Sequence, residues 1–195
     1  MPTLDRTEIV NLMLAAVGES EVSSGEVTTP TMPEVKKAVR VLDKVDRAVQ
    51  LGAWSFTRDI DVELTPVAGE ITLAAGVVAV EAIDRTHLLG IVNGKLYDRL
   101  ENTFTFGGKV RVNTVTQRTF SYLPMHALNL IMARAIREFA EWYLGEPNGA
   151  LREDEVRANH EFHNTEMELA DYWLSDAPDV GRAFMRQPPL PQPHA

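Results

Sequence analysis

Residues 33–64 read PEVKKAVRVLDKVDRAVQLGAWSFTRDIDVEL, and the spacing of the apolar side chains changes within this stretch. In the first half they recur at helical intervals, on a stripe formed by Val35, Ala38, Val39, Leu42, Val45 and Val49. In the second half they fall on even-numbered positions, as in a strand with one apolar face, at Trp54, Phe56, Ile60, Val62 and Leu64. The stretch predicts a helix over 33–52 and a β region that begins at residue 54.

Three further segments outside this stretch have helical spacing. An N-terminal helix is expected over 5–17, and the polar residues 18–32 are expected to connect it to the helix over 33–52. A third helix is expected over 124–144, where Leu123-Pro124 precedes a wide apolar stripe. A fourth is expected over 150–175, with a buried side formed by Phe162, Leu169, Ala170, Trp173 and Leu174.

Residues 54–121, between the second and third helices, predict a mainly antiparallel β region. Two dipeptides, 93–94 (Asn-Gly) and 107–108 (Gly-Gly), are expected to supply the positive φ angles of tight hairpin turns. The apolar run 71–83 predicts a buried strand pair, and alternation over 110–120 predicts a half-exposed strand.

The order of elements predicts an α+β fold, in which the N- and C-terminal helices form an antiparallel bundle and the β region is an insertion. Residues 1–178 are expected to form one domain, and the proline-rich residues 179–195 an extended tail. The apolar residues Phe184, Met185 and Leu190 favour docking of this tail on another chain, with a frayed terminus as the alternative.

Composition excludes several classes of protein. The 195 residues contain no cysteine, so disulfides, thiolate nucleophiles and cysteine-bound metals are excluded, and folding in a reducing cytoplasm fits. The net charge of −9 disfavours tight binding of nucleic-acid phosphates, although DNA could still slide past such a surface. No apolar run approaches the roughly 18 residues of a membrane span, and we expect neither export nor membrane insertion.

One cluster on the fourth helix resembles a metal site and consists of His160, Glu161, His163 and Glu166. A zinc-protease helix needs histidines four positions apart, whereas these are three apart. We therefore expect a solvated helix face and no metal site.

The other candidate catalytic or binding residues also lack the partner residues that such a site would need. His87 and His126 have no serine in a nucleophile-elbow context, and the glycine-rich turns lack the pattern of a phosphate-binding loop. Asp59 and Asp61 could serve a glycosidase, but strand alternation predicts that both lie on the exposed face as solubility charges. The three tryptophans fall on apolar stripes and are expected in the core or at a subunit interface, at Trp54, Trp142 and Trp173. We predict no enzyme, cofactor or metal.

Up to about Asp176, the order of several segments resembles the tail tubular protein A family of short-tailed bacteriophages. The segments are LAAVGE at 14–19, RVLDKVDRAVQ at 40–50 followed by Gly52, Trp54 and Phe56, VNGKLYDR at 92–99, Leu123-Pro124, Ala133-Arg134, Phe139 and Asp171-Tyr172. Ala53, inserted between Gly52 and Trp54, and the proline-rich tail depart from the family pattern.

This resemblance implies a structural virion protein of the tail, assembled in the bacterial cytoplasm. Such a protein would form a head-to-tail ring of roughly twelve copies between the portal and the tail nozzle, tail tubular protein B. Genomic DNA would pass through the lumen. Two alternatives stay open: a tail-associated hydrolase that acts on cell-surface polysaccharide, and a connector protein of a long-tailed phage.

Overall fold

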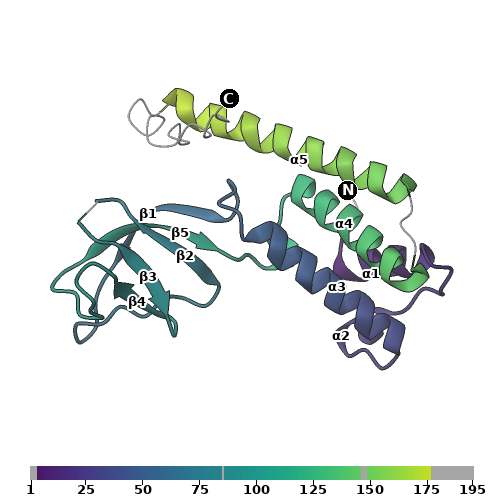
Figure 1. The fold of residues 1–195 in the computed structure, drawn as a ribbon, viewed down its shortest axis with the longest axis horizontal. Coiled ribbons are helices and arrows are strands. Elements are labelled where there is room, and N and C mark those ends of the chain that lie inside the picture. Colours follow the sequence, from purple (N-terminus) through teal and green to yellow (C-terminus); the bar gives the residue numbers. More distant parts are fainter. Residues whose placement is uncertain (1–3, 85, 146–148, 177–195) are drawn as a thin grey trace, which may run out of the picture.

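The computed structural model describes residues 4–84, 86–145 and 149–176. In these residues the strands lie at one end of an elongated molecule and the helices at the other, except that the last helix extends back to the strand end (Figure 1). The helices are α1 (Arg6–Ala15), α2 (Ser24–Thr28), α3 (Pro33–Gln50), α4 (Met125–Leu144) and α5 (Gly149–Asp176), with a 3₁₀ turn, η1, at Phe120–Tyr122. The strands are β1 (Arg58–Leu64), β2 (Val77–Ala82), β3 (Leu89–Val92), β4 (Lys95–Asp98) and β5 (Val110–Thr116).

The α+β prediction is confirmed, and the β region is an insertion between α3 and α4.

Local sequence signals determine where several helices begin or end. The Asp5 side chain accepts a hydrogen bond from the Glu8 amide at 2.8 Å and caps α1. Pro33 occupies the first turn of α3, and Gly145, at φ 75°, ends α4.

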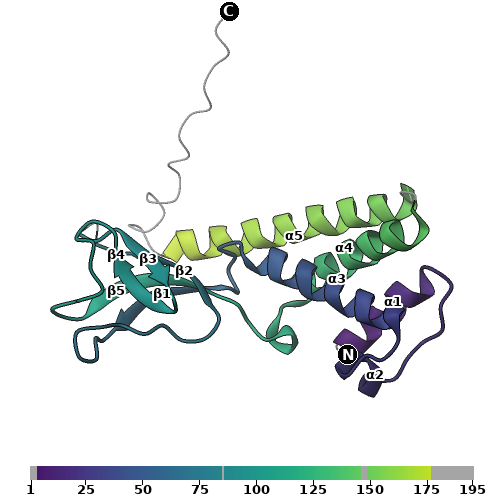
Figure 2. The same ribbon diagram turned by 60° about the horizontal axis from the view of Figure 1, so that its bottom comes forward.

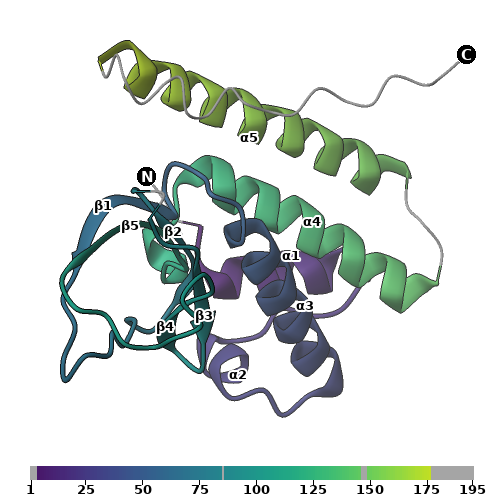
Figure 3. The same ribbon diagram turned by 60° about the vertical axis from the view of Figure 1, so that its left-hand side comes forward.

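Helix α4 is the centre of the helical part. Ile131, Ala135 and Phe139 on this helix have no exposed surface, and none of its residues from 126 to 140 is fully exposed. α4 lies between α5 on one side and α3 on the other, and the views in Figures 1 and 3 agree on this order. The two outer helices α3 and α5 are therefore the flanks of the helical part.

Helix α5 runs back along α4 toward the β region (Figure 2). Glu155 of α5 accepts hydrogen bonds from Arg134, at 2.9 Å, and Arg137, both on α4. Burial alone would raise the pKa of Glu155, but the two guanidinium groups outweigh burial and lower it. A carboxylate that is partly buried between two helices is costly without a cationic partner. Glu155 must therefore lie opposite Arg134 and Arg137, and this requirement fixes the register of α5 on α4.

The β region has its own apolar core. β5 is the central strand of an antiparallel sheet of order β1-β5-β2, and β3 pairs with β4 in a separate hairpin. The side chains buried between these strands and the adjoining loops are Ile71, Leu89, Leu96, Phe106, Val110 and Val112. The strands therefore close over a core of their own and do not share the core of the helices.

The turn at 93–94 is confirmed, because Asn93 and Gly94 adopt φ angles of 52° and 73° between β3 and β4. The hairpin predicted at 107–108 is wrong. Neither of those glycines has a positive φ, and the following strand, β5, pairs with β1 and β2. The pairing of β5 follows from burial of Val110 and Val112 in the core. The glycine pair before β5 does not join it to the preceding segment.

Two other predictions need correction. The run 71–83 was expected to form a strand pair, but it contains one strand, β2, because Gly76 at φ 93° interrupts the run. The residues before Gly76 form only isolated contacts with β4, such as the hydrogen bond from the Leu96 amide to the Ile71 carbonyl at 2.9 Å. Helix α2 lies in the stretch 18–32 that was expected to be only a connection. Its signal is Ser23 followed three positions later by Glu26, whose amide donates to the Ser23 hydroxyl.

The division into a domain over 1–178 and a tail over 179–195 stays a prediction, because residues 177–195 lie outside the described part of the chain. In the described part, no helix combines the length and apolar character needed to cross a membrane.

Candidate functional site

The α5 cluster that resembles a metal site in sequence, and for which we expected a solvated helix face, divides into two environments. His160, Glu161 and His163 are exposed, whereas Glu166 is buried, with 7% of its surface exposed. The expectation of a solvated face is therefore wrong for Glu166. Among the described residues, no group of three or more histidine and carboxylate side chains is arranged to hold a metal ion.

Glu166 lies where the helices join the β region, which we call the neck and define as residues 51–57 and 117–124. Its carboxylate accepts hydrogen bonds from the Ser55 amide at 2.8 Å and the Ser55 hydroxyl at 3.0 Å. It also accepts one from Nε2 of His126, at the start of α4, at 2.8 Å. One side chain of α5 thus connects the first segment of the neck with the start of α4, which follows the second segment. No local sequence pattern indicated this contact.

The order of these three groups excludes a serine-type triad. In such a triad the imidazole stands between the hydroxyl and the carboxylate, so that it can take the hydroxyl proton. Here the carboxylate of Glu166 stands between Ser55 and His126, and the hydroxyl donates to the carboxylate. The arrangement satisfies the polar groups of all three residues and fixes the position of α5, and it leaves Ser55 without the adjacent imidazole that such a triad needs.

A second set of contacts holds the neck on the side of α3. The Gln50 amide group accepts from the backbone N–H of Arg118 at 2.6 Å and donates to its carbonyl at 3.1 Å. The Arg118 guanidinium donates to the Phe56 carbonyl and pairs with Asp59. Both chain crossings between the helices and the strands are therefore held by specific hydrogen bonds.

The prediction that Asp59 and Asp61 share an exposed strand face is wrong. The β1–β5 register shifts between Asp59 and Val62, and Asp61 adopts a positive φ of 58°. This bulge breaks the alternation, so that Ile60 is 59% exposed. Strand β1 also begins at Arg58 and not at residue 54, where the β region was expected to begin.

Each of the two aspartates is paired with its own arginine. Hydrogen bonds from Arg111 lower the pKa of Asp61. Burial would raise the pKa of Asp59, but hydrogen bonds from Arg118 and Thr116 outweigh burial and lower it. A glycosidase needs one carboxylic acid with a raised pKa to protonate the leaving group. Neither residue meets this requirement, and nothing at β1 favours the hydrolase alternative.

His87 belongs to the β region and contacts the buried Asp98, with 2.5 Å between Nδ1 and the carboxylate. Burial would raise the pKa of Asp98, but His87 and the amides of Leu100 and Glu101 together lower it. Because Asp98 caps the turn that follows β4, we assign this pair to the structure of that turn.

The three predicted tryptophan positions differ. Trp54 packs edge-on against Phe162 with ring centroids 4.8 Å apart, and its indole N–H donates to the Val49 carbonyl at 2.7 Å. Trp142 is 54% exposed and has the Lys37 ammonium 4.4 Å from the centre of its ring, so of the two expectations, core or subunit interface, only the interface stays as a prediction for it. The side chain of Trp173 and the residues Phe184, Met185 and Leu190 lie outside what the structure describes.

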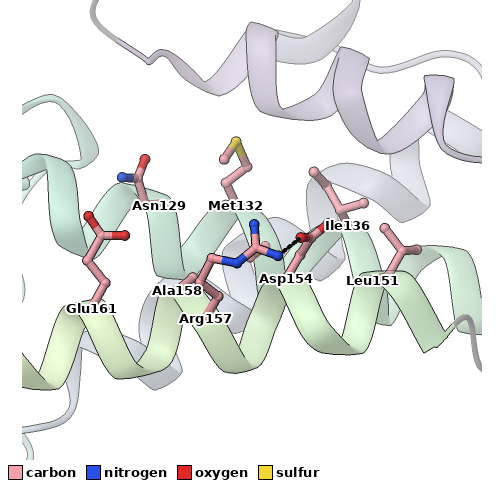
Figure 4. A pocket seen from close by; sticks show the side chains of 9 residues that line it. Asn129, Met132, Ile136, Leu151, Asp154, Arg157, Ala158 and Glu161 are labelled. Carbon is pink, nitrogen blue, oxygen red and sulfur yellow. Dashed lines mark ion pairs between the residues drawn. The ribbon is translucent and has the colours of Figure 1, made fainter.

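An open groove of about 320 Å³ lies between α4 and α5 (Figure 4). Its apolar side chains are Met132, Ala133, Ile136, Leu151 and Ala158. Its charged residues include Glu161 and an ion pair between Asp154 and Arg157 at 3.4 Å. Ligand sites usually enclose their ligand and converge a few buried polar groups on it, so this open groove fits a packing surface better.

Comparison with known proteins assigns the chain to a family. The sequence model of the tail tubular protein family matches residues 7–172, which includes both the helices and the β region. No curated protein matches the chain. The match confirms the family resemblance seen in the sequence and shows a structural component of the bacteriophage tail. The chain belongs to the tail tubular protein family.

Proposed function

We propose that this chain is a ring-forming adaptor of a short-tailed phage. Roughly twelve copies would surround an axis, with the portal on one side and the tail nozzle, tail tubular protein B, on the other. The observation that carries the proposal is the apolar groove along α4 and α5, in a chain whose family builds tails. Helices that leave apolar surface uncovered in the single chain gain burial when another chain covers it.

The charge of the chain supports a conduit for genomic DNA. With 28 acidic and 19 basic side chains, most orientations of the subunit would present more negative than positive charge to the lumen. A negative wall repels phosphates, so DNA would pass without being held. The ring would therefore have no specific DNA-binding site.

The β region offers a second apolar surface for a portal, nozzle or neighbouring subunit. Leu88 and Leu100 are 58% and 61% exposed. They lie close together, because the Arg99 amide donates to the Leu88 carbonyl at 2.8 Å. Two large exposed side chains beside a hairpin are typical of a contact surface in an assembly.

We also propose that residues 179–195 contact another chain of the tail through Phe184, Met185 and Leu190. A chain that lacks 179–195 is expected to keep the urea unfolding midpoint of the full chain while fewer complete tails assemble, because no described core residue is removed. Tail yield by electron microscopy measures assembly.

Two variants make this result specific. Replacing Phe184, Met185 and Leu190 by serine should reproduce the loss of tails, whereas replacing Gln187 and Gln192 by serine should leave tail yield unchanged. Normal tail assembly by the shortened chain would contradict the role of the tail.

The adaptor role is tested by sedimenting the full chain with portal particles of its own phage. The chain is expected to sediment with the portal, and the nozzle protein is expected to join only when the chain is present. Separate sedimentation of chain and portal at concentrations that suffice for tail assembly would contradict the role.

A further inference from the structure

We propose that neighbouring copies meet through α3 of one subunit and α5 of the next, with a basic helix face against an acidic one. This inference rests on the ring proposed above and names the surfaces that would join its subunits. Its occupant is a second copy of this chain, and the argument depends on charge complementarity between two described surfaces.

The outer face of α3 is basic. Its exposed cations are Lys36, Arg40, Lys44 and Arg47, whose spacing places them on one side of the helix. The three carboxylates of α3 are not exposed: Asp46 is buried, and Glu34 and Asp43 are half-buried. Lys44 contacts Glu138 of α4 at 2.7 Å, and the other three cations have no carboxylate oxygen within 4 Å among the described residues. We call this surface the basic face.

The outer face of α5 is acidic. Its exposed carboxylates are Glu153, Asp154, Glu161 and Glu168, which fall on one side of the helix. Arg157 lies among them, but it is paired with Asp154, and Arg152 of the same helix is paired with Glu141 of α4. The remaining carboxylates give this surface a net negative charge. We call it the acidic face.

The positions of the two faces suit a ring. Figure 3 shows α4 between α3 and α5. We infer from this order that the basic face of α3 and the acidic face of α5 lie on opposite flanks of the subunit. A closed ring needs two different surfaces that join head to tail, whereas a symmetric dimer brings one surface against itself. Contact of two basic faces or of two acidic faces would be repulsive, so the charges favour the ring contact over a symmetric pair.

The groove beside the acidic face adds apolar surface to the same contact. Asp154 and Glu161 line the groove, and Met132 and Ile136 of α4 provide apolar side chains within it (Figure 4). Lysine and arginine side chains cover apolar surface with their methylene stems while their charged ends reach carboxylates. The basic face of a neighbour would therefore cover the groove and neutralise the carboxylates beside it.

Charge reversal on each flank tests the contact. One variant carries Arg40→Glu and Arg47→Glu, and the other carries Glu153→Lys and Glu161→Lys. Each variant is expected to lower the yield of rings on portal particles at least about tenfold, because like charges then face each other. The reversal Lys109→Glu with Arg111→Glu, at exposed positions of the β region outside the surface formed by Leu88 and Leu100, is the charge-matched control and should leave the yield unchanged.

Combination of the two reversals identifies the contact itself. A chain that carries all four substitutions, or an equimolar mixture of the two variants, should recover ring assembly, since opposite charges face each other again. Rings that form normally from each single-flank variant would overturn this inference while the ring stands, and so would a failure of both combinations to restore assembly. If the unsubstituted chain forms no ring even on portal particles, the proposed function fails together with the inference.

Discussion

Replacement of Glu166 by alanine is expected to lower the free energy of unfolding by about 3 kcal/mol. The substitution removes the acceptor for the Ser55 amide, the Ser55 hydroxyl and Nε2 of His126. Glu166 is buried and His126 half-buried, so water replaces these hydrogen bonds poorly. Equilibrium unfolding in urea, followed by far-ultraviolet circular dichroism at neutral pH, measures the loss.

Glu168→Ala is the matched control, because Glu168 lies on the same helix and is exposed. Its effect should stay within about 0.5 kcal/mol, as for most surface substitutions. Glu166→Gln keeps an acceptor for part of the network and should fall between the two. Equal unfolding midpoints for Glu166→Ala and Glu168→Ala would show that the neck does not depend on this carboxylate.

Replacement of Phe162 by alanine is expected to have a still larger effect, about 3 to 5 kcal/mol. The ring is 1% exposed and packs against Trp54, at 4.8 Å between centroids, and against His126, at 5.5 Å. Truncation leaves a cavity between α5 and the neck that rigid neighbours cannot fill. The same urea unfolding experiment measures the loss.

Two comparisons isolate the packing contribution. Phe162→Leu keeps most of the volume and should cost less than about 1.5 kcal/mol. Met167→Ala removes an apolar side chain that is 64% exposed and should cost little. Because Phe162 and Glu166 hold the same segment, their combined loss should be less than the sum of the separate losses. A loss for Phe162→Ala no larger than that for Met167→Ala would contradict the packing described above.

The long helices could be predicted because each carries an apolar stripe that burial requires. Val35, Leu42 and Val45 face the core, as their spacing indicated. The turn at 93–94 could be predicted because asparagine and glycine tolerate positive φ. Helix α2 was missed since five residues are too few to show a period, although its Ser23 and Glu26 carried a capping signal.

The neck could not be predicted because its contacts join residues far apart in the chain. Ser55 and Glu166 are separated by 111 positions, and only the packing of α5 on α4 brings them together. The bulge at Asp61 follows from the pairing of β1 with β5, which alternation alone does not indicate. Exposure of Trp142 depends on which helices surround α4, so the apolar stripe in the sequence could not distinguish the core from a subunit interface.

The basic face of α3 and the acidic face of α5 could not be recognised as contact surfaces from the sequence, for a related reason. In the sequence, charged residues on a helix are most simply explained as a solvated face, and the basic residues of α3 and the acidic residues of α5 carry no further signal there. The proposed role of these residues depends on the order of α3, α4 and α5 in space (Figure 3). From this order we infer that the basic face and the acidic face lie on opposite sides of the subunit. A family that builds tails, an open apolar groove and two complementary flanks together describe a part that joins copies of itself.

The central claim is that this chain forms a ring on the portal, and electron microscopy of the purified chain mixed with portal particles tests it most directly. Class averages viewed along the portal axis should show an added ring of roughly twelve subunits with an open centre. Portal particles that stay bare, beside a chain that remains a single subunit at concentrations sufficient for tail assembly, would contradict the claim.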